Sequence, residues 1–169
     1  SHIPQGALER VVTVADDGGS TGRIRQDLDI IAPGDLRNCL VALADKEGLM
    51  EKLFAHRFGG SGNLTGHSFG NLFIAALIEV LGDVEEAMDA TSKVLRVRGK
   101  VIPSSAEKLR LNAEMTDGRI VEGESQIPHA HGKIKRVFTT PEHPRAIQSA
   151  VDAIREADAI VLGPGSLYT

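Results

Sequence analysis

One run of eight residues carries most of the chemistry that this sequence offers. Residues 16–23 read DDGGSTGR and follow a short apolar stretch at 11–15. Carboxylates can hold a divalent cation or take a proton from a hydroxyl, and an arginine can pair with a phosphate. Backbone N–H groups of a glycine-rich turn also favour an anion. The run predicts a phosphate or metal–phosphate site, with a tight turn bearing solvated carboxylates as the alternative.

A second glycine loop, residues 163–169, follows another short apolar stretch. Ligands of open α/β sheets bind beyond the carboxyl ends of the strands, so two such loops in one parallel sheet would share an edge. We expect Asp16 and Asp17 to be the candidate Mg²⁺ ligands there. The ligand-binding residues predicted in the two loops are Asp16, Asp17, Gly18, Gly19, Ser20, Thr21, Gly22, Arg23, Gly163, Gly165 and Ser166.

The segment PGDLRNC, residues 33–39, places polar side chains in the first turn of an expected helix. Asp35 and Asn38 either form the rim of the site, near free backbone N–H groups, or cap and solvate the helix end. Cys39 lies on the apolar stripe of the same helix. That position favours a packed thiol over a nucleophile.

The segment GHSFGN, residues 66–71, opens the most apolar helix of the chain. Polar groups at the start of such a helix are costly unless they meet partners or a ligand. A glycine in a helix also costs about 1 kcal/mol against alanine, so a close approach to its backbone is expected. We predict a binding role for His67, Ser68, Gly70 and Asn71, with a capping cluster as the alternative.

Other chemistries lack support in the sequence. There is neither a G-x-x-x-x-G-K-[ST] loop nor a G-x-G-x-x-G run after a strand. His129 and His131 form a His-x-His pair without a third ligand nearby, so we expect a loop there. Arg57 and Arg98 could reach an anion, although solvent exposure is the usual state of arginine.

Composition narrows the class of protein. The 169 residues are 41% hydrophobic and 25% charged, with a net charge of −4, as in an ordinary soluble domain. The chain lacks the excess of basic residues that is typical of nucleic-acid-binding proteins. No apolar run approaches the ~20 residues that span a membrane. A single cysteine and no signal-peptide pattern favour the cytoplasm. We expect one α/β domain over residues 1–169.

The periodicity predicts several helices. They begin at Ser20 or Thr21, at Asp35 as N-cap after a break at residues 33–34, and at Pro144. Residues 49–54 and 84–95 are also expected to be helical. Residues 67–81 are apolar on nearly every side, which predicts a helix buried between other elements.

Strands are expected at residues 11–15, 133–139 and 159–162, and the period-two pattern of residues 108–115 predicts another. Asp117-Gly118 is a hairpin signal that returns the chain as a strand over residues 119–127. The order of elements predicts a three-layer α-β-α sandwich. It would be Rossmann-like, with a mainly parallel sheet and an antiparallel hairpin.

Four blocks of this chain resemble the CofD/YvcK family. They are VTVADDGGSTGRIR, PGDLRNCLVALA, GHSFGNLFIAAL and VLGPGSLYT, in that order from residue 12 to residue 169. One branch comprises 2-phospho-L-lactate transferases, and the other comprises YvcK-like gluconeogenesis factors. The VRGKVIP stretch and the KIKRVF segment resemble the second branch in particular.

The resemblance implies a cytoplasmic protein that binds a nucleotide sugar, UDP-N-acetylglucosamine, and regulates cell-wall precursor supply and cell shape. A protein partner in precursor synthesis and a homodimer are also expected. The alternative is a transferase that moves a phospholactyl group from a guanosine diphosphate carrier to a deazaflavin with Mg²⁺, Asp16 and Asp17 being its catalytic groups. A third reading is a Rossmann-like dinucleotide binder of another chemistry.

Family members begin with a strand and a further glycine-rich loop, and they continue well past GPGSLYT. Neither part is in residues 1–169. We therefore expect the chain to be an incomplete portion of a longer family domain. Residues 16–23 would then provide only part of the nucleotide site.

Overall fold

The computed structural model describes residues 8–44 and 48–163 and confirms the predicted α/β class. Two sheets organise the chain: a parallel pair, β1-β2, and an antiparallel sheet of order β4-β3-β5. The helices are α1 (Gly19–Leu28), α2 (Pro33–Leu43), α3 (Leu49–Ala55), α4 (Phe69–Leu81), α5 (Val84–Leu95), α6 (Gln148–Glu156) and the short 3₁₀ helix η1 (Ile127–His129). The strands are β1 (Glu9–Val12), β2 (Lys100–Pro103), β3 (Arg110–Met115), β4 (Ile120–Glu122) and β5 (Ile134–Thr140).

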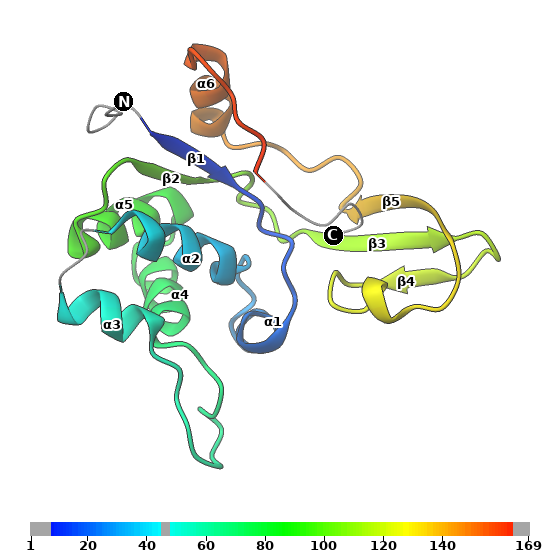
Figure 1. Ribbon diagram of the computed structural model, residues 1–169, viewed down its shortest axis with the longest axis horizontal. Helices are drawn as coiled ribbons and strands as arrows, with labels where there is room; N and C mark the ends of the chain where they lie inside the picture. Colours follow the sequence, from blue (N-terminus) through cyan, green and yellow to red (C-terminus); the bar gives the residue numbers. More distant parts are fainter. Residues whose placement is uncertain (1–7, 45–47, 164–169) are drawn as a thin grey trace.

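The parallel pair lies between helices on both sides. β1 and β2 run in register from Glu9 opposite Lys100 to Val12 opposite Pro103. Helices α2 and α5 pack on one face of this pair and α6 on the other, which is the expected three-layer arrangement (Figure 1). We call this part, with all six α-helices, the parallel lobe. Its main core includes Val14, Leu36, Leu40, Phe54, Ile74, Val101 and Ile102.

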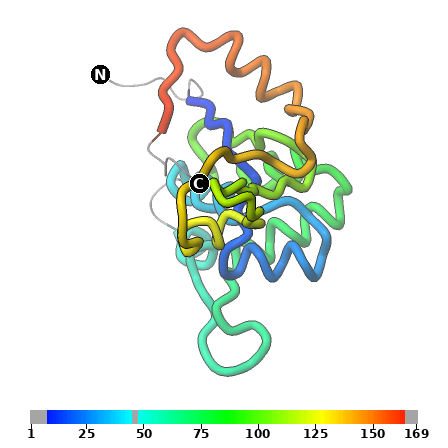
Figure 2. Tube along the Cα trace, turned by 90° about the vertical axis from the view of Figure 1, so that its right-hand side faces the viewer, coloured from blue at the N-terminus to red at the C-terminus, as the bar shows by residue number. Residues whose placement is uncertain are grey.

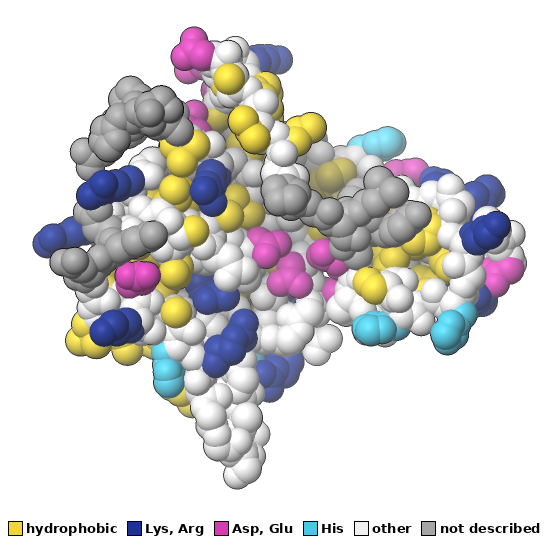
Figure 3. All heavy atoms as spheres, in the orientation of Figure 1, with side chains coloured by type: hydrophobic (Ala, Val, Ile, Leu, Met, Phe, Trp, Pro, Cys, Tyr) yellow, Lys and Arg dark blue, Asp and Glu magenta, His cyan; other side chains and the backbone are white. Residues whose placement is uncertain are grey.

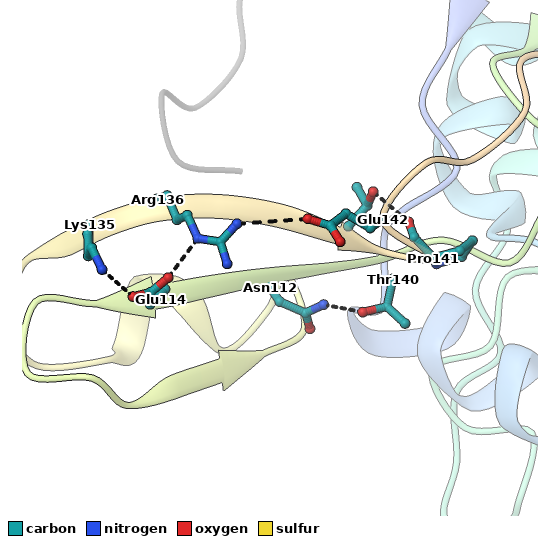
Figure 4. A network of polar contacts seen from close by, with 8 residues as sticks. Asn112, Glu114, Lys135, Arg136, Thr140, Pro141 and Glu142 are labelled. Atoms are coloured by element: carbon teal, nitrogen blue, oxygen red, sulfur yellow. Dashed lines mark hydrogen bonds and ion pairs between the residues drawn. The ribbon is translucent and has the colours of Figure 1, made fainter.

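The antiparallel sheet with η1 forms a second part, the hairpin lobe, to one side of the parallel lobe (Figure 1). Ala113, Met115 and Ile127 form its own small core. On its surface, Glu114 accepts hydrogen bonds from Lys135 Nζ and Arg136 Nε, both at 2.6 Å (Figure 4).

At the inner end of the hairpin lobe, Asn112 Nδ2 donates to Thr140 Oγ1 at 2.8 Å (Figure 4). Asn112 is 2% exposed, although it is a polar residue that alternates with apolar ones in the period-two pattern of residues 108–115. The cross-strand hydroxyl satisfies one donor of its amide, whereas no partner is found for its Oδ1 within the described residues.

The predicted strands were confirmed in part. β3 and β5 form close to their expected ranges, whereas β1 lies two to three residues earlier than expected. The strand predicted over residues 119–127 ends at Glu122, because Gly123 turns the backbone at φ +93°. The strand predicted at residues 159–162 is not formed, and Ile160, Val161 and Leu162 are 61%, 89% and 92% exposed. β2 was not predicted.

Four helix starts differ from prediction, and α4 begins at Phe69 rather than at residue 67. Gly18, not Ser20 or Thr21, is the N-cap of α1. Ala32 is the N-cap of α2, so Pro33 opens the helix and Asp35 lies inside its first turn. Proline suits that first position because it has no N–H to satisfy and its φ is already helical. α6 begins at Gln148 rather than at Pro144.

Helix α4 lies between other helices, as predicted, but it is only partly buried. It contacts α1, α2, α3 and α5, and Gly70, Asn71, Ile74 and Ala75 are buried. Its C-terminal end is exposed, with Val80 at 79%, although the sequence of the helix is apolar nearly all round. None of the helices in the described ranges is long and apolar enough to cross a membrane.

Candidate functional site

The run at residues 16–23 forms a tight turn into α1. Gly18 N–H donates to Asp16 Oδ1 at 2.8 Å, and Gly22 N–H donates to Gly18 O at 3.1 Å. A Cβ at Gly22 would lie 2.1 Å from the Asp17 carbonyl oxygen, so only glycine fits. From the other side, Arg25 Nη1 donates to Asp16 O at 2.8 Å. These contacts hold the carboxylate of Asp16 in a defined place at the start of α1.

Asp17 joins the two lobes. Its Oδ1 accepts a hydrogen bond of 2.8 Å from Ser125 N–H, and its Oδ2 lies against Gly123 in the same turn. Arg25 reinforces this junction, since its Nη2 donates to Leu109 O at the start of the hairpin lobe. The structure thus gives the Asp17 carboxylate a role in positioning the hairpin lobe over the loop.

We expect Asp17→Ala to destabilise the protein by about 1–3 kcal/mol, because it leaves the half-buried Ser125 N–H without its acceptor. Urea unfolding should show the loss as a lower midpoint with little change in slope. Asp89, exposed on α5, provides the control Asp89→Ala, for which we expect about 0.5 kcal/mol or less. Equal midpoints for the two variants would contradict the lobe-joining role.

Three carboxylates from distant parts of the chain meet beside this loop. Asp16 lies at the start of α1, Asp35 in the first turn of α2 and Glu124 after β4. Burial, followed by the charge of Asp16, raises the pKa of Asp35. Burial raises the pKa of Glu124 too, and the charges of Asp16, Asp35 and Asp17 raise it further. Figure 3 shows acidic side chains gathered at the middle of the face in view.

This carboxylate cluster can accept a proton or help to hold a cation. Within residues 8–44 and 48–163, however, no group of three or more His, Cys, Asp or Glu side chains has the arrangement of a metal site. Mg²⁺ commonly binds through one or two carboxylates together with substrate phosphates. Asp16 and its neighbours fit that partial role.

The raised pKa of Glu124 determines the direction in which folding stability changes with pH. The folded protein binds this proton more tightly than the unfolded chain does, so stability is lost as pH rises above the ordinary pKa of 4.5. We expect Glu124→Gln to melt at a higher temperature than the parent protein at pH 7. The difference should disappear as pH falls and Glu124 takes up its proton.

Differential scanning calorimetry of both proteins between pH 4 and pH 8 measures this effect. Glu156→Gln, at an exposed position in the last turn of α6, is the control that should show no pH-dependent gain. A Glu124→Gln variant that melts at or below the parent temperature at pH 7 would mean that Glu124 is stabilised as a carboxylate.

Ser20 connects the loop to the start of α4. Its Oγ lies 3.3 Å from His67 Nδ1 and accepts hydrogen bonds from Ser68 N–H and Asn71 Nδ2, each at 3.3 Å. Burial and the nearby charge of Arg23 lower the pKa of His67, so its ring is neutral at pH 7 and Nδ1 can accept the hydroxyl proton. A hydroxyl has one donor and two acceptor positions, and all three are engaged. Ser20 therefore positions other groups.

The buried network continues into α3. Ser68 Oγ donates to Phe54 O at 3.3 Å and caps α4 by accepting from Asn71 N–H. The close approach predicted at Gly70 is confirmed, since a Cβ there would lie 2.8 Å from atoms of both Phe54 and Arg37. Asn71 is 1% exposed, and its Oδ1 has no hydrogen-bond partner. Asn71 is thus the member of this network with an acceptor left for a ligand.

The remaining predicted residues are placed as follows. Thr21 is buried with its Oγ1 beside Gly34, and Gly19 is exposed. Arg23 Nη2 donates to Thr65 O at 2.8 Å, and exposed Asn38 accepts from Arg37 Nη2. Gly163 is exposed, while Gly165 and Ser166 lie outside the described residues, so their meeting with residues 16–23 stays a prediction. Cys39 packs against the core as expected, and His129 and His131 are exposed.

Two residues near the site, Glu124 and Arg37, were not predicted from the sequence. Glu124 follows a hairpin strand, and only the folded chain brings it to Asp16. Arg37 lies between the predicted residues Asp35 and Asn38 and was not itself predicted, yet it is 8% exposed and lies beside the Ser68 network. Its place in the first turns of α2, on the side of Leu36 and Leu40, was the available signal for burial.

The chain matches the 2-phospho-L-lactate transferase CofD family over residues 4–169. It is 56% identical over 162 residues to the gluconeogenesis factor of Bacillus subtilis and 54% identical over 163 residues to that of Halalkalibacterium halodurans. Both alignments cover 96% of the chain and 51% of the relative. The chain therefore spans about half the length of these curated relatives.

The fold has a close counterpart among solved structures. A crystal structure described as a member of the UPF0052 family, from Bacillus halodurans, matches with a TM-score of 0.92 at 55% sequence identity. The match covers 96% of this chain and 52% of that protein. The sequence and structural matches thus extend over the same share of the chain.

Proposed function

The chain belongs to the 2-phospho-L-lactate transferase CofD family, and from this premise we propose that it acts as a gluconeogenesis factor that binds UDP-N-acetylglucosamine. The relatives at 54–56% identity carry the name gluconeogenesis factor. Under this proposal the protein works in the cytoplasm. It adjusts cell-wall precursor supply and cell shape through a protein partner rather than by turnover of its own.

The proposal rests on one observation, which is that Ser20 joins two polar segments of the chain. Through it, the loop at residues 16–23 is fixed against His67, Ser68 and Asn71, at the start of a helix of 13 residues. Ser20 thus links two kinds of binding group. The carboxylates suit a metal-bound diphosphate, and the amide oxygen of Asn71 suits a hydroxyl or amide group of a sugar. This pairing suits a nucleotide sugar, which carries both kinds of group.

Calorimetric titration of the full-length protein with UDP-N-acetylglucosamine, with and without Mg²⁺, tests this proposal. We expect saturable binding with one nucleotide sugar per chain and no consumption of it over hours. Absence of binding to the full-length protein would refute the nucleotide-sugar reading. The proposed cellular role is tested by deleting the gene and measuring growth and cell shape on gluconeogenic carbon sources.

A phospholactyl transferase is the second candidate, and the grouping of Asp16 with Asp35 and Glu124 favours it. In that reaction Asp16 would accept the proton of the deazaflavin hydroxyl as a new P–O bond forms and the nucleotide leaves. Mg²⁺ would offset the charge of the transferred group. Incubation with the guanosine diphosphate carrier, deazaflavin and Mg²⁺ separates the candidates, because only a transferase forms the new phosphodiester.

A further inference from the structure

Three arginines beside the candidate site, Arg23, Arg37 and Arg57, donate hydrogen bonds to backbone carbonyls. Lys108, Arg110, Arg119, Lys135 and Arg136 form ion pairs with Asp or Glu. Within the described part of the chain, no such pair is found for Arg23, Arg37 or Arg57.

Two of the three arginines, Arg23 and Arg57, contact the base of the loop between α3 and α4. Arg23 Nη2 donates to Thr65 O at 2.8 Å, and Arg57 Nη1 donates to the next carbonyl, Gly66 O, at 3.1 Å. The loop extends away from the rest of the protein, as both backbone views show (Figures 1 and 2). Its base is closed by hydrogen bonds between Phe58 and residues 66–67, at 2.7 and 2.9 Å. Arg23 and Arg57 therefore have a rigid support.

Arg37 completes the group from beneath. Its Nη1 reaches Phe54 O, the carbonyl that also accepts from Ser68 Oγ, so Arg37 adjoins the buried network. Burial lowers its pKa, and the positive charge of Arg57 lowers it further, which places the two guanidinium groups within electrostatic range. Asp35 acts in the opposite direction as the weakest of these influences.

Arg37 is also incompletely satisfied. It is 8% exposed, and within residues 8–44 and 48–163 no hydrogen-bond partner is found for its Nε, although both Nη atoms donate. An arginine with this burial is normally paired or fully hydrogen-bonded, since an uncompensated buried charge is costly. Repulsion between neighbouring guanidinium groups adds to that cost. An anion held beside the three side chains would offset their uncompensated charge and the repulsion between them.

We propose that Arg23, Arg37 and Arg57 form a binding site for a phosphate-class oxyanion next to the carboxylate cluster. Guanidinium groups match the geometry of phosphate oxygens and bind them through charge-assisted hydrogen bonds. Figure 3 shows basic side chains grouped just below the acidic ones on the same face. The anion is either free phosphate or a phosphoryl group of a larger ligand. Binding of inorganic phosphate alone tests this site, so the site does not depend on the nucleotide-sugar proposal.

The test is thermal melting and direct titration of the full-length protein with inorganic phosphate, against chloride at equal ionic strength. We expect phosphate to raise the melting temperature more than chloride does. Arg23→Gln and Arg57→Gln should each weaken phosphate binding about tenfold, the effect of losing one charge-assisted contact. Both side chains are exposed, so these variants should fold. Arg155→Gln, exposed on α6, is the control and should bind like the parent protein.

Arg37→Lys provides a further variant that keeps the charge and loses the guanidinium fork, and we expect weaker phosphate binding from it. Competition with UDP-N-acetylglucosamine distinguishes the source of the anion. Displacement of phosphate supports a phosphoryl group of that ligand, and independent binding supports free phosphate. A phosphate effect no greater than that of chloride, or equal in Arg57→Gln and Arg155→Gln, would overturn the proposal. Loss of nucleotide-sugar binding alone would refute only the proposed function.

Discussion

Gly22→Ala is expected to destabilise the protein by more than about 3 kcal/mol, the largest single effect that we predict. The added Cβ would lie 2.1 Å from the Asp17 carbonyl oxygen and 2.9 Å from the carbonyl carbon. Both atoms belong to the backbone, so relief requires movement of the turn itself. That movement would displace Asp16 from the carboxylate cluster and Asp17 from Ser125.

The measurement for Gly22→Ala is urea unfolding monitored by circular dichroism, with the soluble yield as a second readout. Gly62→Ala is the matched control, because no heavy atom lies within 4 Å of its added Cβ and it lies in an exposed loop. We expect that control to stay within about 0.5 kcal/mol of the parent protein. A Gly22→Ala protein as stable as Gly62→Ala would show that the turn can open without cost.

Ser20→Ala is expected to cost about 2–4 kcal/mol, because three buried groups lose one shared partner. Ser68 N–H and Asn71 Nδ2 lose their acceptor, and His67 Nδ1 loses the hydroxyl at 3.3 Å. Ser68 is 0% exposed and Asn71 is 1% exposed, so water does not readily replace the hydroxyl. The variant should also weaken ligand binding, since the loop would no longer be fixed to α4.

Chemical denaturation and ligand titration of Ser20→Ala, compared with Ser61→Ala, check this expectation. Ser61 lies exposed in the loop between α3 and α4 and should be replaceable within about 0.5 kcal/mol. If Ser20→Ala lost affinity but kept full stability, Ser20 would contact the ligand directly rather than position its neighbours.

Local signals in the sequence were sufficient for several elements. Helix α5 has the predicted bounds, because Asp83 caps it by accepting from Glu86 N–H at 2.9 Å and its apolar residues recur at helical spacing. The Asp117-Gly118 turn also forms, with Gly118 at φ +88° and Asp117 Oδ1 accepting from Arg119 N–H. Such features depend on residues within one turn of each other, so they can be predicted from adjacent residues in the sequence.

Burial of the apolar segments was less predictable. Residues 67–81 and 159–162 are both strongly apolar, yet Val80 and Leu162 are exposed. Hydrophobic pattern indicates which residues favour burial, but whether a partner surface covers them depends on the arrangement of whole elements. β2 was missed for a related reason: its four residues form a strand by pairing with β1, which lies about 90 residues earlier.

The α/β class, the family and the segments that carry polar chemistry could be recognised from the amino-acid sequence, because glycine turns, caps and periodicity are local and each family block is contiguous. The role of each polar residue depends on the folded structure. That structure assigned Asp17 to the junction with Ser125 and used all the hydrogen-bonding capacity of Ser20. It also brought Glu124 to Asp16, and Arg57 within electrostatic range of Arg37. Hydrogen bonds and Coulomb forces act through space, so residues far apart in the chain acquire their roles only when folding places them side by side.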